Sequence, residues 1–414
     1  MTALQRFIAA SGMTNLADGI AVVAWGWIAS LLTRDPLLVA LLPVALRLPW
    51  VLLALPAGVV ADRVDRRRLI LAMDAVRGLA FAGAAVALWA ALPLQPAMAD
   101  GVSSPALYGF LMLAALVVGG AEVFRDNAAQ TMLPALVPEA QLERANGRLW
   151  SVELLTNALI GPALGAVLIG LWLPLAFGLN AAAYGGAMLL VLGLAGSFRA
   201  ERPDPRPWRA ELREGFHFLK GVPLLRTLAW STGLWNLLHQ MIVIGVVLHA
   251  QENLGLSAEA YGLTLAGGAF GGIAGSLLGE RIARALGAAR TMQWMILASG
   301  PCFAAMALAP NALGLALCFA AIEFSGFVWN VVSVSTRQRL VPDPLRGRVN
   351  SIYRLLAWGM MPLGLILSGV VVSLGETVLP RGTALVLPFI AAGVGSVLLA
   401  LSVWRAIPRG FAAL

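Results

Sequence analysis

LVPEAQLERANG, residues 136–147, returns further along the chain as LVPDPLRGRVNS, residues 340–351. Pro138 and Pro342 lie 204 positions apart, and twice 204 is 408, close to the full length of 414 residues. A polar segment that recurs after half the chain indicates an internal duplication. We therefore expect two similar units, each with this segment between two of its elements.

The composition shows what kind of units these are. Hydrophobic residues make up 59% of the chain and charged residues 12%, with a mean hydropathy of +0.82, whereas a soluble domain carries about 25% charged residues. Continuous apolar runs of about 20 residues predict membrane-spanning helices and exclude the alternating pattern of a barrel. Such charge-free runs occupy 78–99, 101–121, 154–198, 227–251, 260–279, 355–375 and 382–404.

The apolar runs predict an all-α integral membrane protein with twelve transmembrane helices in two pseudo-symmetric six-helix bundles, 1–198 and 223–414. A cytoplasmic linker, 199–222, joins them, and within it WRAELREGFHFLK, 208–220, is typical of an amphipathic helix on the membrane surface. The expected spans are 5–32, 37–61, 69–92, 105–132, 146–170, 173–197, 224–250, 258–281, 290–309, 312–336, 347–373 and 382–405.

The basic residues predict the orientation. Most of the 29 lysines and arginines fall in loops on the side of the two termini, whereas only Arg34 and Arg381 fall in loops on the other side. This bias predicts that the N- and C-termini are both cytoplasmic. It also explains a pI near 10.6 without a nucleic-acid partner. Because Asp18 interrupts the first apolar stretch, we expect a permanent span there and not a cleaved signal peptide.

The loop GVVADRVDRRR, 58–68, resembles a signature of the major facilitator superfamily, G-x-x-x-D-R-x-G-R-R. Gly58, Asp62, Arg63 and Arg67 fit the pattern, whereas Asp65 stands in place of its second glycine. The resemblance implies a conformational latch, with Asp126 as the acidic partner of the arginines. The alternative is a basic loop that serves only to orient the chain.

A second resemblance lies in NALIGPALGA, 157–166. Gly161, Pro162 and Gly165 match the G-x-x-x-G-P-x-x-G-G motif of proton-coupled antiporters in this superfamily, whereas Asn157 and Ala166 replace glycines. The match implies an exporter. The alternative is close packing of small residues with no further role.

The two repeated loops narrow the resemblance to the branch of drug:proton antiporters that includes macrolide-efflux and enterobactin-exporter proteins, over residues 5–405. It implies a secondary active exporter with alternating access in the lipid bilayer of the bacterial cytoplasmic (inner) membrane, with a small-molecule substrate and protons as partners. The substrate itself does not follow from it.

Charges inside spans are site candidates, because an unpaired charge near the bilayer centre is costly. Asp18 has no basic residue near it in sequence and is expected to carry the transported proton; the alternative is a structural role with Asn15 or Arg47. Glu122, Arg125 and Asp126 share one face of a helix. They form either a neutralised cluster or an Arg125–Asp126 pair that leaves Glu122 free.

In the superfamily, helices 1, 4, 7 and 10 line a central cavity, which implies that Asp18, Glu122 and Glu323 lie on its walls. The seventh helix would add Asn236, His239 and Gln240; His239 either relays protons or only packs. The tenth would add Asn330 and a stacking wall at Trp329. Other charges in spans are expected to hold contacts between the halves: Asp74, Arg77, Arg148, Glu153 and Arg354.

The sequence contains no phosphate-binding G-x-x-x-x-G-K-[ST] motif, and Lys220 is its only lysine, which excludes ATP-driven transport by this chain. No catalytic or metal-binding constellation is present in it, so we expect no enzyme and no cofactor. The expected function is export of moderately hydrophobic, drug-like molecules, with a cationic preference suggested by the three carboxylates. Alternatives are a dedicated exporter of an endogenous metabolite such as a siderophore, a nutrient importer, or, outside transport, a lipid scramblase or sensor. We expect a monomer.

Overall fold

The structure is a computed structural model that describes residues 1–413 apart from 139–140, 197, 200–207 and 343–344. Within these described ranges, twelve helices are long and apolar enough to cross a membrane. The predicted all-α membrane fold is thereby confirmed. The chain divides into two compact units: residues 1–205 with 257–263, and residues 206–256 with 264–414.

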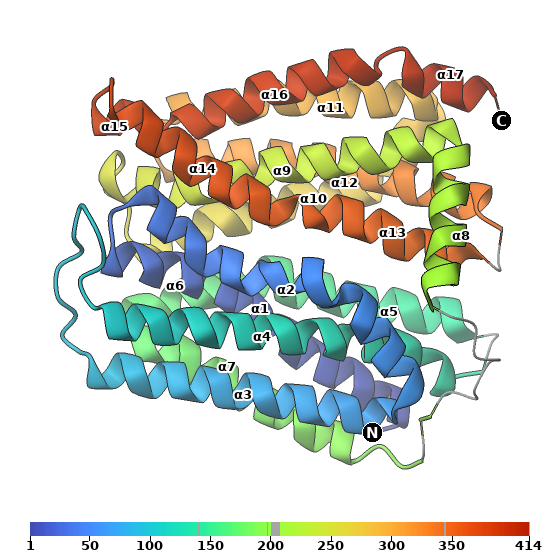
Figure 1. The fold of residues 1–414 in the computed structure, drawn as a ribbon, viewed down its shortest axis with the longest axis horizontal. Coiled ribbons are helices and arrows are strands. Elements are labelled where there is room, and N and C mark those ends of the chain that lie inside the picture. Colours follow the sequence, from blue (N-terminus) through green and yellow to red (C-terminus); the bar gives the residue numbers. More distant parts are fainter. Residues whose placement is uncertain (139–140, 197, 200–207, 343–344, 414) are drawn as a thin grey trace. The chain divides into compact units, whose positions relative to one another are not determined.

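In the first unit, α4 packs against both α2 and α3, while α7 packs against α3 and α1 (Figure 1). Polar caps set the starts of the helices: the carboxylate of Asp35 accepts two backbone N–H bonds at the start of α2, and that of Asp65 accepts one at the start of α3. The helices are α1 (Ala3–Leu32), α2 (Pro36–Arg63), α3 (Arg66–Ala90), α4 (Pro105–Met132), α5 (Leu142–Leu154), α6 (Gly161–Leu171) and α7 (Leu173–Leu192).

In the second unit, α9 packs against α14 and α16, and α11 packs against α12 and α16. Its helices are α8 (Trp208–Gly221), α9 (Pro223–Glu252), α10 (Ala258–Leu286, whose residues up to 263 belong to the first unit), α11 (Ala288–Ala305), α12 (Ala312–Leu340), α13 (Arg346–Gly359), α14 (Met361–Glu376), α15 (Arg381–Ala384), α16 (Leu387–Val403) and α17 (Ala406–Ala412).

The fifth span is not one regular helix. Between α5 and α6 the backbone widens into a π-helical segment, η3 (Leu155–Ile160), directly before Gly161 and Pro162. Pro162 has no backbone N–H, so the regular hydrogen-bond ladder is interrupted there. A Cβ atom on Gly161 would lie 2.6 Å from the Cα of Gly19. Only glycine therefore permits this approach of α6 to α1.

Two spans differ from their predicted form. The sixth was predicted to continue to residue 197, but α7 ends at Leu192, and the carbonyl of Gly193, its C-cap, accepts a hydrogen bond from Arg6. The eleventh was predicted as one helix, but it is divided into α13 and α14, with Pro362 in the first turn of α14. A proline fits a first turn because its missing N–H has no intrahelical partner there.

The predicted amphipathic helix is present as α8. It packs against α13, where Arg348 Nη1 donates to Glu214 Oε2 at 2.5 Å, and its Leu219 is buried in the core of the second unit. This helix is thus a packed part of the second unit and more than a connection. The neighbouring residues 200–207 of the predicted linker lie outside the described ranges.

Candidate functional site

The Asp18 carboxylate on α1 has two partners from distant helices. The guanidinium of Arg77 on α3 forms an ion pair with Asp18 Oδ1, and the Tyr184 hydroxyl on α7 donates to the same oxygen at 2.8 Å. The guanidinium carbon of Arg77 also lies 4.4 Å from the centroid of the Tyr184 ring. The expectation of an unpaired Asp18 was therefore wrong. Neither Asn15 nor Arg47 is its partner in the contacts described.

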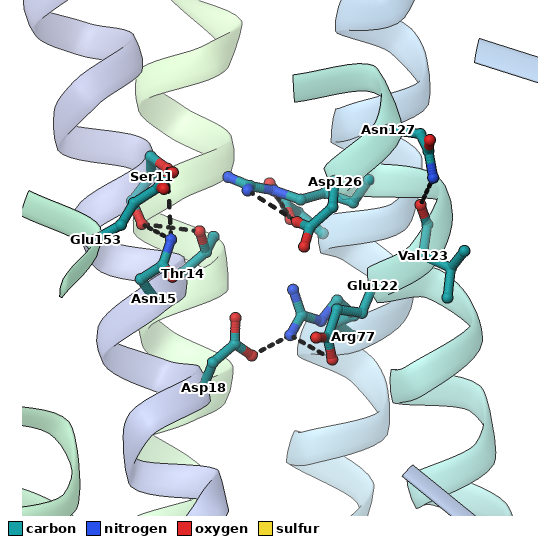
Figure 2. Close-up of polar contacts among 12 residues, drawn as sticks. Ser11, Thr14, Asn15, Asp18, Arg77, Glu122, Val123, Asp126, Asn127 and Glu153 are labelled. Atoms are coloured by element: carbon teal, nitrogen blue, oxygen red, sulfur yellow. Dashed lines mark hydrogen bonds and ion pairs between the residues drawn. The ribbon is translucent and has the colours of Figure 1, made fainter. Parts of the chain in front are cut away.

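Glu122 on α4 lies between two arginines. Its Oε1 is 3.5 Å from Arg47 Nη1 on α2. Its Oε2 is 3.8 Å from Nη2 of Arg77, the arginine that also pairs with Asp18 (Figure 2). Close packing makes the first contact possible, since a Cβ on Gly119 would lie 2.9 Å from the carbonyl carbon of Leu46. Glu122 is thus paired, although not with Arg125. The expectation of a neutralised cluster formed within helix 4 alone was therefore wrong.

These contacts join four side chains, Asp18, Arg47, Arg77 and Glu122, which we call the four-charge cluster. Two carboxylates and two guanidinium groups make it neutral when all four are ionised. The cluster borders a small cavity of about 50 Å³ inside the first unit, which has room for a few water molecules at roughly 10–15 Å³ each. The cavity is lined by Asp18, Ala21, Val22, Leu46, Arg47, Val118, Glu122 and Asn157.

Arg125 forms a second group of charges with two acidic residues. Its Nε lies 3.5 Å from Asp74 Oδ1, and its Nη1 lies 3.4 Å from Asp126 Oδ1. Asp74 is fully buried. Asp74 and Arg77, which were expected at contacts between the halves, thus both form ion pairs inside the first unit.

Glu153 and Asn15 connect α1 to the irregular fifth span. The Ser11 hydroxyl donates to Glu153 Oε1 at 2.7 Å, and Asn157 Nδ2 donates to Asn15 Oδ1 at 3.3 Å. Glu153 was expected at a contact between the halves, whereas this hydrogen bond lies within one unit. Both bonds are polar links across the interface at which Gly161 and Gly165 permit close packing; a Cβ on Gly165 would lie 2.9 Å from the Ile20 carbonyl oxygen.

In the basic loop, Arg67 donates to the carbonyl oxygens of Val191 and Leu192 at the end of α7, at 3.2 and 2.6 Å. Among the described contacts, none joins Arg63 or Arg67 to Asp126, whose ion pair is with Arg125. A glycine in this position would allow a neighbouring helix to pack closely, but nothing lies within 4 Å of a Cβ built on Gly58. The side chain of Asp62 lies outside the part of the chain that the structure describes.

The second unit holds a smaller polar group. His239 Nε2 on α9 lies 2.9 Å from Glu323 Oε1 on α12, and the His239 ring stacks on Trp235 with centroids 5.1 Å apart. Trp235 Nε1 donates to Ser299 Oγ at 3.2 Å. Predicted residues of helices 7 and 10 are thereby brought together. Glu323, like Asp18 and Glu122, has a nitrogen partner.

The other predicted residues of this unit are placed differently. Trp329 is buried and its Nε1 donates to Thr232 Oγ1 at 3.1 Å, so the expected stacking wall at this position was wrong. Asn236 Nδ2 donates to the Ala357 carbonyl at 2.9 Å. Gln240 keeps a side-chain hydrogen bond with His239 and packs its Cβ against Gly364, whereas Asn330 is exposed. Asn236 and Gln240 therefore help to pack α9 against α13 and α14.

Sequence reasoning missed two members of the site. Arg77 was assigned to another role, and Tyr184 was not singled out, although it is one of only four tyrosines and lies in the long charge-free run 154–198. A hydroxyl inside such a run needs a partner when it is buried. That requirement was the available signal for Tyr184.

Comparisons with known proteins agree with this architecture. The family model of the Major Facilitator Superfamily matches residues 7–365. The chain is 28% identical over 376 residues to the multidrug efflux pump Tap of Mycolicibacterium fortuitum, and the aligned region covers 85% of each protein. It is 26% identical over 307 residues to the enterobactin exporter EntS of Escherichia coli O81 (strain ED1a), and here the aligned region covers 72% of this chain and 67% of that protein.

Solved structures show the same fold at low identity. The crystal structure of a mutant of the nucleoside transporter NupG aligns with a TM-score of 0.78 at 14% identity, over 98% of this chain and 100% of that one. A bacterial homologue of the iron transporter ferroportin in its inward-facing state aligns with a TM-score of 0.72 at 17% identity, over 97% and 98%. With its family model matched over most of its length, this chain belongs to the major facilitator superfamily and is a non-enzymatic, multi-pass membrane transporter.

Proposed function

We propose that this transporter exports moderately hydrophobic small molecules in exchange for protons, by alternating access. The observation that supports the proposal best is the four-charge cluster, which places two carboxylates beside a cavity within membrane spans. Charged groups in that position are costly and are typical of ion and substrate pathways. The similarity to a multidrug efflux pump and to an enterobactin exporter agrees with export.

The cluster favours Glu122 over Asp18 as the group that takes up the proton. Asp18 is held by Arg77 and by the Tyr184 hydroxyl at 2.8 Å, whereas the ion pairs of Glu122 are longer, at 3.5 and 3.8 Å. Protonation removes fewer favourable contacts from the more loosely paired carboxylate. It also leaves the cluster with one excess positive charge, and this change supplies a driving force for rearrangement.

The test is accumulation of dyes, macrolides and a catechol siderophore in an efflux-deficient host. Cells that express the intact chain, Glu122→Gln, Asp18→Asn or the exposed-loop control Asp100→Asn are compared with and without a protonophore. We expect export by the intact chain and by Asp100→Asn that a protonophore abolishes, and loss of export in Glu122→Gln at equal expression. Export that is unaffected by the protonophore, or by Glu122→Gln, would contradict proton antiport through this residue.

The dedicated export of an acidic metabolite is a second candidate. Arg47 lines the cavity, and a guanidinium is a suitable partner for an anionic group. All three carboxylates that suggested a cationic substrate are also paired here. Export of the siderophore alone in the same assay would favour this candidate over broad drug efflux.

A further inference from the structure

Arg47 is more exposed and less tightly paired than Arg77, the other cation of the four-charge cluster. Its side chain is 35% exposed, compared with 0% for Arg77 and 13% for Glu122. Arg77 is fixed by its ion pair with Asp18 and by the Tyr184 ring. Arg47 has one described ion pair, at 3.5 Å to Glu122. Moving the Arg47 guanidinium away from Glu122 should therefore cost less free energy than moving the Arg77 guanidinium away from its partners.

We propose that Arg47 is a tethered counter-cation that occupies Glu122 and sets the charge selectivity of the cavity. A cationic molecule reaches Glu122 only by displacing this guanidinium, whereas neutral molecules do not compete with it. This inference rests on the proposed function only in taking the cavity as part of the substrate pathway.

The net charge of the cluster decides which ligands should gain affinity when Arg47 is removed. With Arg47 in place, two negative and two positive groups balance. Without it, Asp18 and Glu122 share the single guanidinium of Arg77, which lies within ion-pair distance of both. The excess negative charge then has no counter-ion among the four, and in a partly buried site such a charge attracts a cation strongly.

A purely structural role for Arg47 predicts a different result. If the ion pair with Glu122 only held α2 against α4, neutralising Arg47 would lower the thermal stability of the protein and weaken binding of every ligand alike. A tethered counter-cation predicts instead that binding of cations alone becomes tighter.

The experiment measures binding of two probes of similar shape to purified protein in detergent at one pH. Methylguanidinium is a cation small enough to take the place of the Arg47 guanidinium, and methylurea is its neutral counterpart. The variants are Arg47→Gln, Arg47→Met as a second neutral side chain, Arg47→Lys to keep the charge, and Arg290→Gln as an exposed-arginine control. We expect both neutral variants to bind methylguanidinium about tenfold more tightly, a change equal to roughly 1.4 kcal/mol, with the affinity for the neutral probe unchanged within about twofold.

The double variant Arg47→Gln/Glu122→Gln locates the effect. We expect this variant to lose the gain in affinity, because the Glu122 carboxylate that the loss of Arg47 would expose is also gone. Failure of both folded neutral variants to bind the cation more tightly, an equal gain for the neutral probe, or a gain that survives in the double variant would each overturn the inference. Tighter cation binding with no export of any compound in cells would instead refute the proposed function and leave the inference intact.

Discussion

The ion pair between Arg77 and Asp18 is the contact in this site whose loss is expected to cost the most. Arg77 is fully buried, and it is shared by Asp18, Glu122 and the Tyr184 ring. Removing one partner of a buried ion pair leaves an uncompensated charge, which typically costs about 3–5 kcal/mol. Replacing both partners by neutral groups avoids that charge.

We therefore predict that Arg77→Met lowers the free energy of unfolding by about 3–5 kcal/mol and that Asp18→Asn, added to it, restores more than half of the loss. Thermal unfolding of the purified variants in detergent measures both effects. An additive loss in the double variant would show that the two side chains are not coupled.

The same residues show how far sequence reasoning reaches. Asp18, Glu122, Glu323 and His239 were identified because charged and polar residues inside apolar spans are rare and costly. The partners of Asp18 and Glu122 were not identified, since Asp18 meets Arg77 and Tyr184 across 59 and 166 positions. Local spacing shows which residues share a face of one helix, but only the packing of α1, α3 and α7 decides which of these faces meet.

At the scale of elements, apolar length predicted the twelve spans well, and irregular helices were the main difference. The π-helical segment before Pro162 and the division between α13 and α14 depend on how single helices meet their neighbours. The interface of α1 and α6 is the clearest case, because Gly161 and Gly19 bring the two backbones into contact. Its role in packing is directly testable.

We predict that Gly161→Ala destabilises the protein by about 1–3 kcal/mol, because its new methyl group has no space against α1. Gly185→Ala in α7 is the matched control. Nothing lies within 4 Å of a Cβ built there, so the lower backbone entropy of alanine is expected to stabilise the helix by about 0.5–1 kcal/mol. Thermal unfolding of both variants provides the comparison, and similar shifts in the two would argue against close packing at Gly161.

At the scale of the whole molecule, the two units differ in the charged and polar side chains that they contain. The first unit contains the four-charge cluster and the Arg125 group, whereas the polar group of the second centres on His239 and Glu323. Both groups draw on the first and fourth spans of their unit, which agrees with the duplication indicated by the repeated loop. The charges of the second unit have nevertheless diverged, and the repeat alone could not predict this.

The distribution of basic residues leads to a last prediction, which concerns orientation. If the termini are cytoplasmic, the loop after α3 faces outward and the connection between α10 and α11 faces the cytoplasm. In a background with Cys302→Ser and Cys318→Ser, a cysteine at the exposed position 100 should react with a membrane-impermeant maleimide in intact cells. A cysteine at position 290, exposed at the start of α11, should react only after the cells are permeabilised, because the reagent must first cross the membrane. The reverse pattern would place both termini outside and would contradict the orientation predicted from this bias.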